Sequence, residues 1–229
     1  LPAVTDADQT GADLTAYLNQ WWQAHIATRF GVESCLEVEY EMHFERFLMP
    51  TVRGSEKGSK KRYAGMTCEQ GERRLVFKGL ETVRSDWSQL AREFQQALYG
   101  KIFRDEAVES FIKDTVRAVL QGERDEQLVL RRRLRRKLVD YRKNVPPHVR
   151  AARLAETIRQ ERGLPRQYEN GGWIEYLMTV NGPEPKAYLA SPLDYRFYID
   201  RQLGPVADAI LAFRATSLAK ILDRQLNLF

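Results

Sequence analysis

Cysteine and histidine are scarce in this sequence of 229 residues, which contains two cysteines and three histidines. Cys35 and Cys68 lie far apart and form neither a CxxC motif nor a disulfide framework, so a reducing compartment is favoured. His25, His43 and His148 share no metal-ligand spacing with one another or with the cysteines. The sequence therefore excludes a disulfide-stapled scaffold and predicts no zinc site.

Several other signals are missing. No run of 18 apolar residues is present, which excludes a transmembrane helix, and we expect no membrane partner. We find no Walker loop, no dinucleotide-binding fingerprint and no paired nucleophile and base. Leu1 to Val4 lack the basic and apolar regions of a signal peptide, so we expect a cytoplasmic location. The missing initiator methionine predicts a fragment or a processed chain.

Positive charge is modest overall but concentrated in two segments. The chain carries 36 Lys and Arg against 31 Asp and Glu, for a net charge of +5 at pH 7. Residues 51–84 contain nine bases and four acids, and residues 131–153 contain ten bases and one acid. Phosphate-binding surfaces concentrate Lys and Arg because affinity rises with the number of counterions released. These segments indicate a nucleic-acid partner, with two solvated faces that bind nothing as the alternative.

The first third of the chain predicts a helix followed by antiparallel strands. Apolar residues recur at helical spacing over 6–27, and apolar and acidic residues alternate as in a strand over 36–42. A second apolar stretch at 44–49 continues this strand after a bend. Segments 60–68 and 73–78 predict a hairpin, and an exposed loop precedes it.

The rest of the chain is predominantly helical. A composition break near residue 85 marks the best internal boundary. We expect helices from about 85 to 103, at 107–120 and at 147–161, and a strand at 173–180. Further helices are expected from Ser191 or Asp194 to about residue 222, with an interruption near Gly204 and Pro205. The fold class is therefore α+β.

The arginine-rich run at 128–141 is ambiguous. Leu130, Leu134, Leu138 and Tyr141 form a helical stripe, yet the segment also suits a short strand. Either form displays guanidinium groups, which bind phosphates in bidentate fashion. The run contains no base-specific code, so we expect contacts with the nucleic-acid backbone.

Four segments in register resemble family B DNA polymerases over nearly the whole chain, and the bacterial members are nearest in pattern. They are Lys60-Lys61-Arg62-Tyr63-Ala64-Gly65, Lys78 to Arg84 with Asp86 and Trp87, Tyr141 to Leu154, and Ile174-Glu175-Tyr176 followed by Asp194, Tyr198, Gln202, Leu203 and Pro205. The resemblance implies the C-terminal part of a palm with an antiparallel sheet and a helix (1–84), a mainly helical thumb (85–220) and a tail (221–229).

The resemblance also implies a grip on primer–template DNA through its backbone and minor groove. The alternative is that the Lys-Lys-Arg-Tyr residues are ordinary exposed strand residues. Ser85 stands where the family often has a second arginine, so no contact is expected there. The residues expected to contact DNA are Lys60, Lys61, Arg62, Tyr63, Lys78, Arg84, Arg131, Arg132, Arg135, Tyr141, Lys143, His148, Arg150 and Arg153.

Phosphodiester formation in this family uses two Mg²⁺ ions held by aspartates of motifs that this sequence does not contain. We therefore expect no catalytic residue, no metal ligand and no cofactor in this chain, and no activity of the chain alone. Glu39 and Glu41 are candidates for a position near the metal site of the complete enzyme. A solvent-facing acidic strand edge is the alternative interpretation.

The last residues resemble the peptide by which bacterial replication proteins bind the sliding clamp. Gln225, Leu226, Leu228 and Phe229 supply an amide and three apolar side chains for an apolar groove. A frayed amphipathic helix end is the alternative. The partners expected from the resemblance are duplex DNA, the bacterial sliding clamp and the remainder of a polymerase chain, in the nucleoid.

Two other functions stay open at this point. One is a self-standing nucleic-acid-binding adaptor that recruits a clamp. The other is an assembly module whose basic segments meet an acidic protein. A duplex-binding measurement across salt concentrations separates the assembly module from the other two, because phosphate contacts weaken steeply as salt rises.

Overall fold

The structure, a computed structural model, describes residues 6–51, 59, 61–69, 71–84, 87–143 and 145–223. The chain forms two compact units: Leu1–Phe47 with Gly65–Val76, and Leu48–Ala64 with Phe77–Phe229. Within the described ranges, no helix has both the length and the hydropathy needed to cross a bilayer.

The first unit begins with helix α1, Ala7–Phe30, which confirms the first predicted helix. The carboxylate of Asp6 accepts a hydrogen bond from the backbone N–H of Gln9 at 2.9 Å and caps the helix start. The helix ends at Gly31, whose φ of 65° suits glycine. None of the α1 residues is buried.

The strand predicted over 36–42 is wrong, because residues 33–44 carry no regular secondary structure. The backbone of Val38 is instead paired with the side-chain amide of Asn19 in α1, through bonds of 2.8 and 3.0 Å. The Tyr40 hydroxyl donates to Asp8 at 2.6 Å. The alternation of apolar and acidic residues correctly indicates an extended backbone. A β-strand also needs a neighbouring strand to pair its backbone groups, and here the side chain of Asn19 in α1 binds the Val38 backbone instead. Glu39 and Glu41 therefore do not belong to a sheet.

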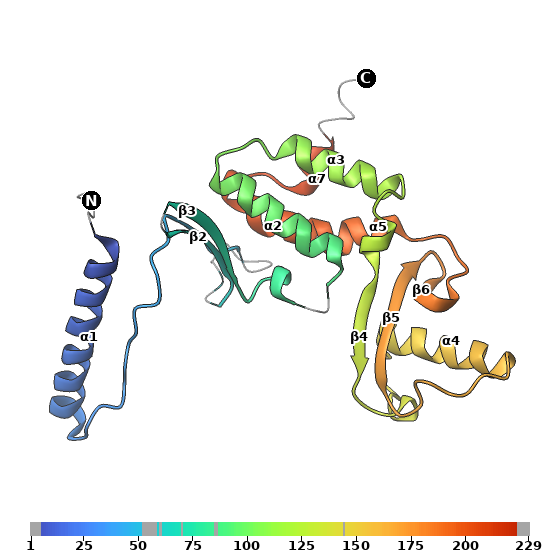
Figure 1. Cartoon of the computed structure of the whole chain (residues 1–229), viewed down its shortest axis with the longest axis horizontal. Coiled ribbons are helices and arrows are strands. Elements are labelled where there is room, and N and C mark those ends of the chain that lie inside the picture. Colours follow the sequence, from blue (N-terminus) through green and yellow to red (C-terminus); the bar gives the residue numbers. More distant parts are fainter. Residues whose placement is uncertain are drawn as a thin grey trace. The chain divides into compact units, whose positions relative to one another are not determined.

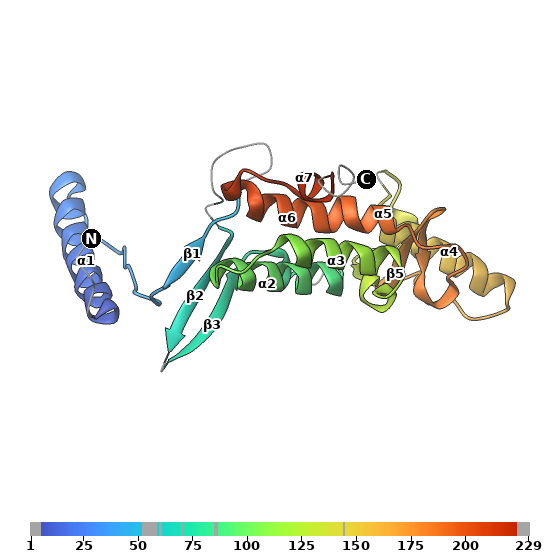
Figure 2. The same cartoon turned by 90° about the horizontal axis from the view of Figure 1, so that it is seen from above.

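The predicted hairpin is confirmed. The first antiparallel sheet has the order β1-β2-β3, formed by Arg46–Leu48, Tyr63–Glu69 and Glu72–Lys78. Its strands are visible in Figure 2. Residues 63, 64, 77 and 78, at one end of the hairpin, belong to the second unit.

Helices form the largest layer of the second unit. Figures 1 and 2 show α2 (Gln89–Phe103), α3 (Glu109–Leu120), α6 (Gly204–Leu211) and α7 (Leu218–Asp223) packed side by side. The core contains fully buried Leu98, Ile112, Ile210 and Ile221. The helices expected to end near 103 and to span 107–120 are confirmed. Ser88 caps α2 through the backbone N–H of Ala91.

The predicted interruption near Gly204 and Pro205 is also confirmed. A short helix, α5 (Tyr195–Tyr198), continues into a π-helical turn, η5 (Ile199–Leu203), before α6 begins. The backbone N–H of Gly204 reaches back five residues to the carbonyl of Ile199. Because Pro205 has no N–H to donate, the regular hydrogen-bond ladder cannot continue through this position.

The arginine-rich run resolves into strand β4, Leu130–Leu134, followed by the 3₁₀ turn η3, Leu138–Asp140. β4 pairs with β5 (Gly172–Thr179), which pairs with β6 (Gly182–Pro185), giving a second antiparallel sheet. Helix α4, Pro147–Glu161, begins with the proline expected there and lies against this sheet.

Register divides the arginines of β4 between the two faces of this sheet. Arg131 lies opposite Glu175 and Arg133 opposite Trp173, so these four side chains share one face. Arg132 lies opposite the buried Ile174, on the other face. This division exists in a strand but not in a helix, because successive strand side chains alternate between faces.

Candidate nucleic-acid interface

The Lys-Lys-Arg-Tyr segment lies at one end of the β2–β3 hairpin, although Lys60 is outside the described residues. Lys61 is exposed and Tyr63 is half-buried. Gly79, which follows β3, has a φ of +65°, and a Cβ at this position would collide with the carbonyl oxygen of Lys61. The turn after β3 thus packs against the backbone of Lys61 and fixes its position, while its side chain stays in solvent.

Arg62 is directed to a buried carboxylate. It forms an ion pair with Glu81 of the 3₁₀ turn η1 (Glu81–Val83), a residue that is 5% exposed. The other carboxylate oxygen of Glu81 accepts from Nε2 of Gln95 at 2.8 Å. Oε1 of Gln95 in turn accepts from the backbone N–H of Thr82 at 2.9 Å. This network connects the hairpin, η1 and α2.

The network changes the interpretation of Arg62. A buried carboxylate is stable only when it is paired and hydrogen-bonded, and Arg62 supplies the charge that Glu81 requires. The DNA contact proposed for Arg62 from the sequence stays a prediction. Among the described residues of segments 61–65 and 78–84, the exposed cations are Lys61, Lys78 and Arg84, which form the first basic group.

A second basic group lies on β4 and at the start of α4. His148, in the first turn of α4, is half-buried, and burial together with the nearby Arg132 guanidinium lowers the pKa of its imidazole. The imidazole is therefore neutral near pH 7, and it can offer a phosphate a hydrogen bond but no charge. Arg131 lies on the opposite face of the sheet and shares no surface with His148 and Arg132.

Three of the expected DNA contacts form one hydrogen-bonded group next to η3. The backbone N–H of Arg135 donates to the Tyr141 hydroxyl at 3.1 Å. The Arg153 guanidinium donates to the backbone carbonyls of Leu138 and Tyr141, at 3.2 and 2.7 Å. Part of the Arg153 guanidinium is therefore already hydrogen-bonded to the backbone at the η3 turn. The remaining two expected contacts, Lys143 and Arg150, are exposed.

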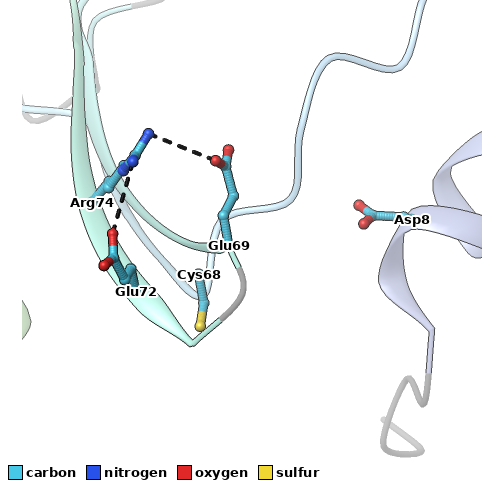
Figure 3. A pocket seen from close by; sticks show the side chains of 5 residues that line it. All are labelled: Asp8, Cys68, Glu69, Glu72 and Arg74. Carbon is cyan, nitrogen blue, oxygen red and sulfur yellow. Dashed lines mark ion pairs between the residues drawn. The ribbon is translucent and has the colours of Figure 1, made fainter.

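Acidic residues gather at the other end of the hairpin. Asp8, Cys68, Glu69, Glu72 and Arg74 line an open pocket of about 540 Å³ (Figure 3). Arg74 lies between Glu69 and Glu72, at 3.8 and 3.7 Å from their carboxylates. Because this guanidinium is already balanced by carboxylates, the hairpin tip does not offer phosphates a net positive surface.

The described residues do not fit the two Mg²⁺ ions that the resemblance implies. Among the described residues, no group of three or more His, Cys, Asp or Glu side chains could hold a metal ion. Glu39 and Glu41 belong to the irregular segment 33–44 and form no such group. We therefore assign no catalytic step to these residues.

Comparison with known proteins gives the family of this chain. The protein-family model for DNA polymerase family B matches residues 18–212, which are most of the chain. The chain belongs to family B of the DNA polymerases. DNA polymerase II of Escherichia coli is 52% identical over 224 residues, which are 98% of this chain and 28% of that protein. The resemblance to the bacterial members is thereby confirmed.

More distant family B relatives share the same region. The DNA polymerase of Thermococcus aggregans is 31% identical over 186 residues, which are 77% of this chain and 9% of that protein. The solved family B DNA polymerase of Pyrobaculum calidifontis matches with a TM-score of 0.54 at 21% identity, and supports the fold alone. That alignment covers 84% of this chain and 24% of the archaeal chain. The chain thus spans between 9% and 28% of the length of these three polymerases.

Some residues of these sites carry little functional signal in the sequence, because their contacts are with residues from distant segments. In the sequence, Glu81 is one residue of the Lys78–Arg84 segment, and Gln95 belongs to no motif. A signal for Gln95 was available, since it stands next to Phe94 on the apolar face of a predicted helix. Trp173 was counted only as a strand residue. The predicted clamp-binding residues Gln225, Leu226, Leu228 and Phe229 lie outside the described residues.

Proposed function

We propose that this chain holds primer–template DNA, as part of the palm and thumb of a DNA-directed DNA polymerase. The observation that carries the proposal is the exposed Lys61 on a backbone fixed by Gly79 and by the Arg62–Glu81 network, in a family B chain. A lysine held in this way reaches phosphates or the minor-groove acceptors that all base pairs share. Such contacts suit an enzyme that must hold any correctly paired primer end.

The basic group on β4 and α4 extends this proposal to the thumb. Arg132, Arg135, Lys143 and Arg150 are exposed and have the charge for sequence-independent phosphate contacts. In the complete enzyme, the carboxylates that bind two Mg²⁺ ions and the nucleotidyl-transfer step would come from other parts of the polymerase. The chain alone would bind DNA without extending it.

The test is duplex binding by fluorescence anisotropy across a salt series. The logarithm of the affinity should fall linearly with the logarithm of the salt concentration, and Lys61→Ala should lower this slope by about 1. Lys220→Ala, in α7 and outside both basic groups, is the matched control and should leave the slope unchanged. Salt-independent binding, or equal slopes for both variants, would contradict the proposal.

We also propose that the C-terminal residues bind the bacterial sliding clamp. A short peptide with one amide and three apolar side chains fits a shallow apolar groove, and the tether raises the local concentration of polymerase at the primer end. Removal of residues 225–229 should abolish retention on immobilised clamp without changing duplex affinity. Clamp retention by the truncated chain would disprove this assignment.

A further inference from the structure

A second pocket lies beside the sheet β4-β5-β6. Its volume is about 520 Å³, within the usual range of small-molecule sites, about 300–1,000 Å³. The residues that matter for its chemistry come from β4, β5, α4 and the 3₁₀ turn η4 (Lys186–Tyr188). They are Arg131, Arg159, Trp173, Glu175, Lys186 and Tyr188.

Guanidinium groups lie over two of the aromatic rings that line this pocket, Trp173 and Tyr188. The Arg131 guanidinium lies 4.6 Å from the centroid of the Trp173 ring, and Arg162 lies 5.1 Å from that of Tyr188. Arg159 donates to the Tyr188 hydroxyl at 3.3 Å. Trp173 is nevertheless 49% exposed, so part of its surface is available to a ligand.

The charges lining the pocket favour an anion with a planar group. Three cations, Arg131, Arg159 and Lys186, and one carboxylate, Glu175, line the pocket. Lys186 also lies 4.0 Å from the carboxylate of Glu126. Within the described part of the chain, Arg131 makes no ion pair, and its guanidinium lies over the Trp173 indole. An aromatic platform beside guanidinium groups is suited to a base that stacks and a phosphate that pairs with charge. An acidic peptide would use the cations but leave the indole uncovered.

We propose that this pocket binds one unpaired nucleotide of single-stranded DNA, with the base on Trp173 and the phosphate at Arg131. The Glu175 carboxylate can accept a hydrogen bond from the exocyclic amine of a cytosine, adenine or guanine base. The site goes beyond the proposed grip on duplex DNA. It uses the face of the sheet opposite Arg132, and it requires a base that is neither paired with a complementary base nor stacked on its neighbours.

The test is binding of a fluorescein-labelled tetradeoxycytidylate to the 229-residue chain, followed by anisotropy. Trp173→Ala should weaken binding about tenfold, whereas Trp173→Phe, which keeps an aromatic face, should retain most of the affinity. Trp21→Ala, in the exposed helix α1, is the matched control and should bind like the parent chain. Duplex affinity should be unchanged in all three variants, which separates this site from the proposed function.

An abasic tetramer of equal charge tests the stacking directly and should bind about tenfold more weakly than tetradeoxycytidylate. Equal binding of the two tetramers, or full affinity in Trp173→Ala, would overturn the proposal. Tighter binding of tetraglutamate than of tetradeoxycytidylate would overturn it in favour of an acidic peptide. If Trp173→Ala fails to fold by circular dichroism, the abasic comparison and Trp173→Phe still decide the question.

Discussion

The Arg62–Glu81–Gln95 network should contribute more to stability than any exposed ion pair of the chain. Arg62→Ala would leave the Glu81 carboxylate buried, with Gln95 as its remaining partner among the contacts described above. Breaking a buried pair from one side costs about 3–5 kcal/mol. The Arg62 side chain is 38% exposed, so water compensates in part and we expect a loss of about 2–3 kcal/mol in the free energy of unfolding.

A double substitution distinguishes the buried charge from other effects of losing the arginine. Glu81→Gln removes the charge but keeps an amide that can accept from Arg62, so it should cost less than Arg62→Ala. The double variant Arg62→Ala with Glu81→Gln should be more stable than Arg62→Ala alone, because no unpaired carboxylate remains buried. Arg73→Ala breaks an exposed pair with Glu45 and should cost at most about 1 kcal/mol.

The measurement is urea unfolding followed by circular dichroism, for the four variants and the parent chain. A double variant less stable than Arg62→Ala would refute the assignment of the cost to an uncompensated charge. Arg62→Ala and Arg73→Ala with equal losses would refute the claim that burial sets the magnitude. A parallel measurement of duplex affinity then shows whether Arg62 also contacts DNA.

Two further predictions concern the backbone at Gly79 and the titration of His148. Gly79→Ala should destabilise the chain by about 1–3 kcal/mol more than Gly71→Ala. Both glycines have positive φ, but only a side chain at Gly79 meets the Lys61 carbonyl oxygen. Equal losses in the free energy of unfolding, measured with urea, would contradict this contact. The lowered pKa of His148 means that the unfolded chain binds a proton at a higher pH than the folded chain. The free energy of unfolding should therefore fall as pH decreases through about 6.5, the usual pKa of histidine. His148→Gln should remove part of that fall in unfolding measurements between about pH 7.5 and 5. An unchanged pH profile would show that His148 does not titrate in this way.

The helices and the hairpin could be predicted from sequence because their signals are local. Helical spacing, a capping residue and a stopping glycine or proline act within a few residues, and α1, α2, α3 and α4 follow them. The segment 36–42 had equally clear alternation but formed no strand. Its potential partner is decided by distant residues, and here the side-chain amide of Asn19 in α1 makes the bonds to the Val38 backbone that a neighbouring strand would make.

The sequence alone determined the family, the α+β class and the positions of the cations, because motif order and charge are properties of the chain. Only the tertiary structure decided how those cations are used. Arg62 and Lys61 are neighbours in sequence, yet one pairs with a buried carboxylate and the other stays in solvent. Arg131 and Arg132 are also neighbours, and strand register places them on opposite faces of a sheet. Burial and pairing depend on residues brought together from distant segments, and these set whether a charge stabilises the fold or stays exposed to solvent.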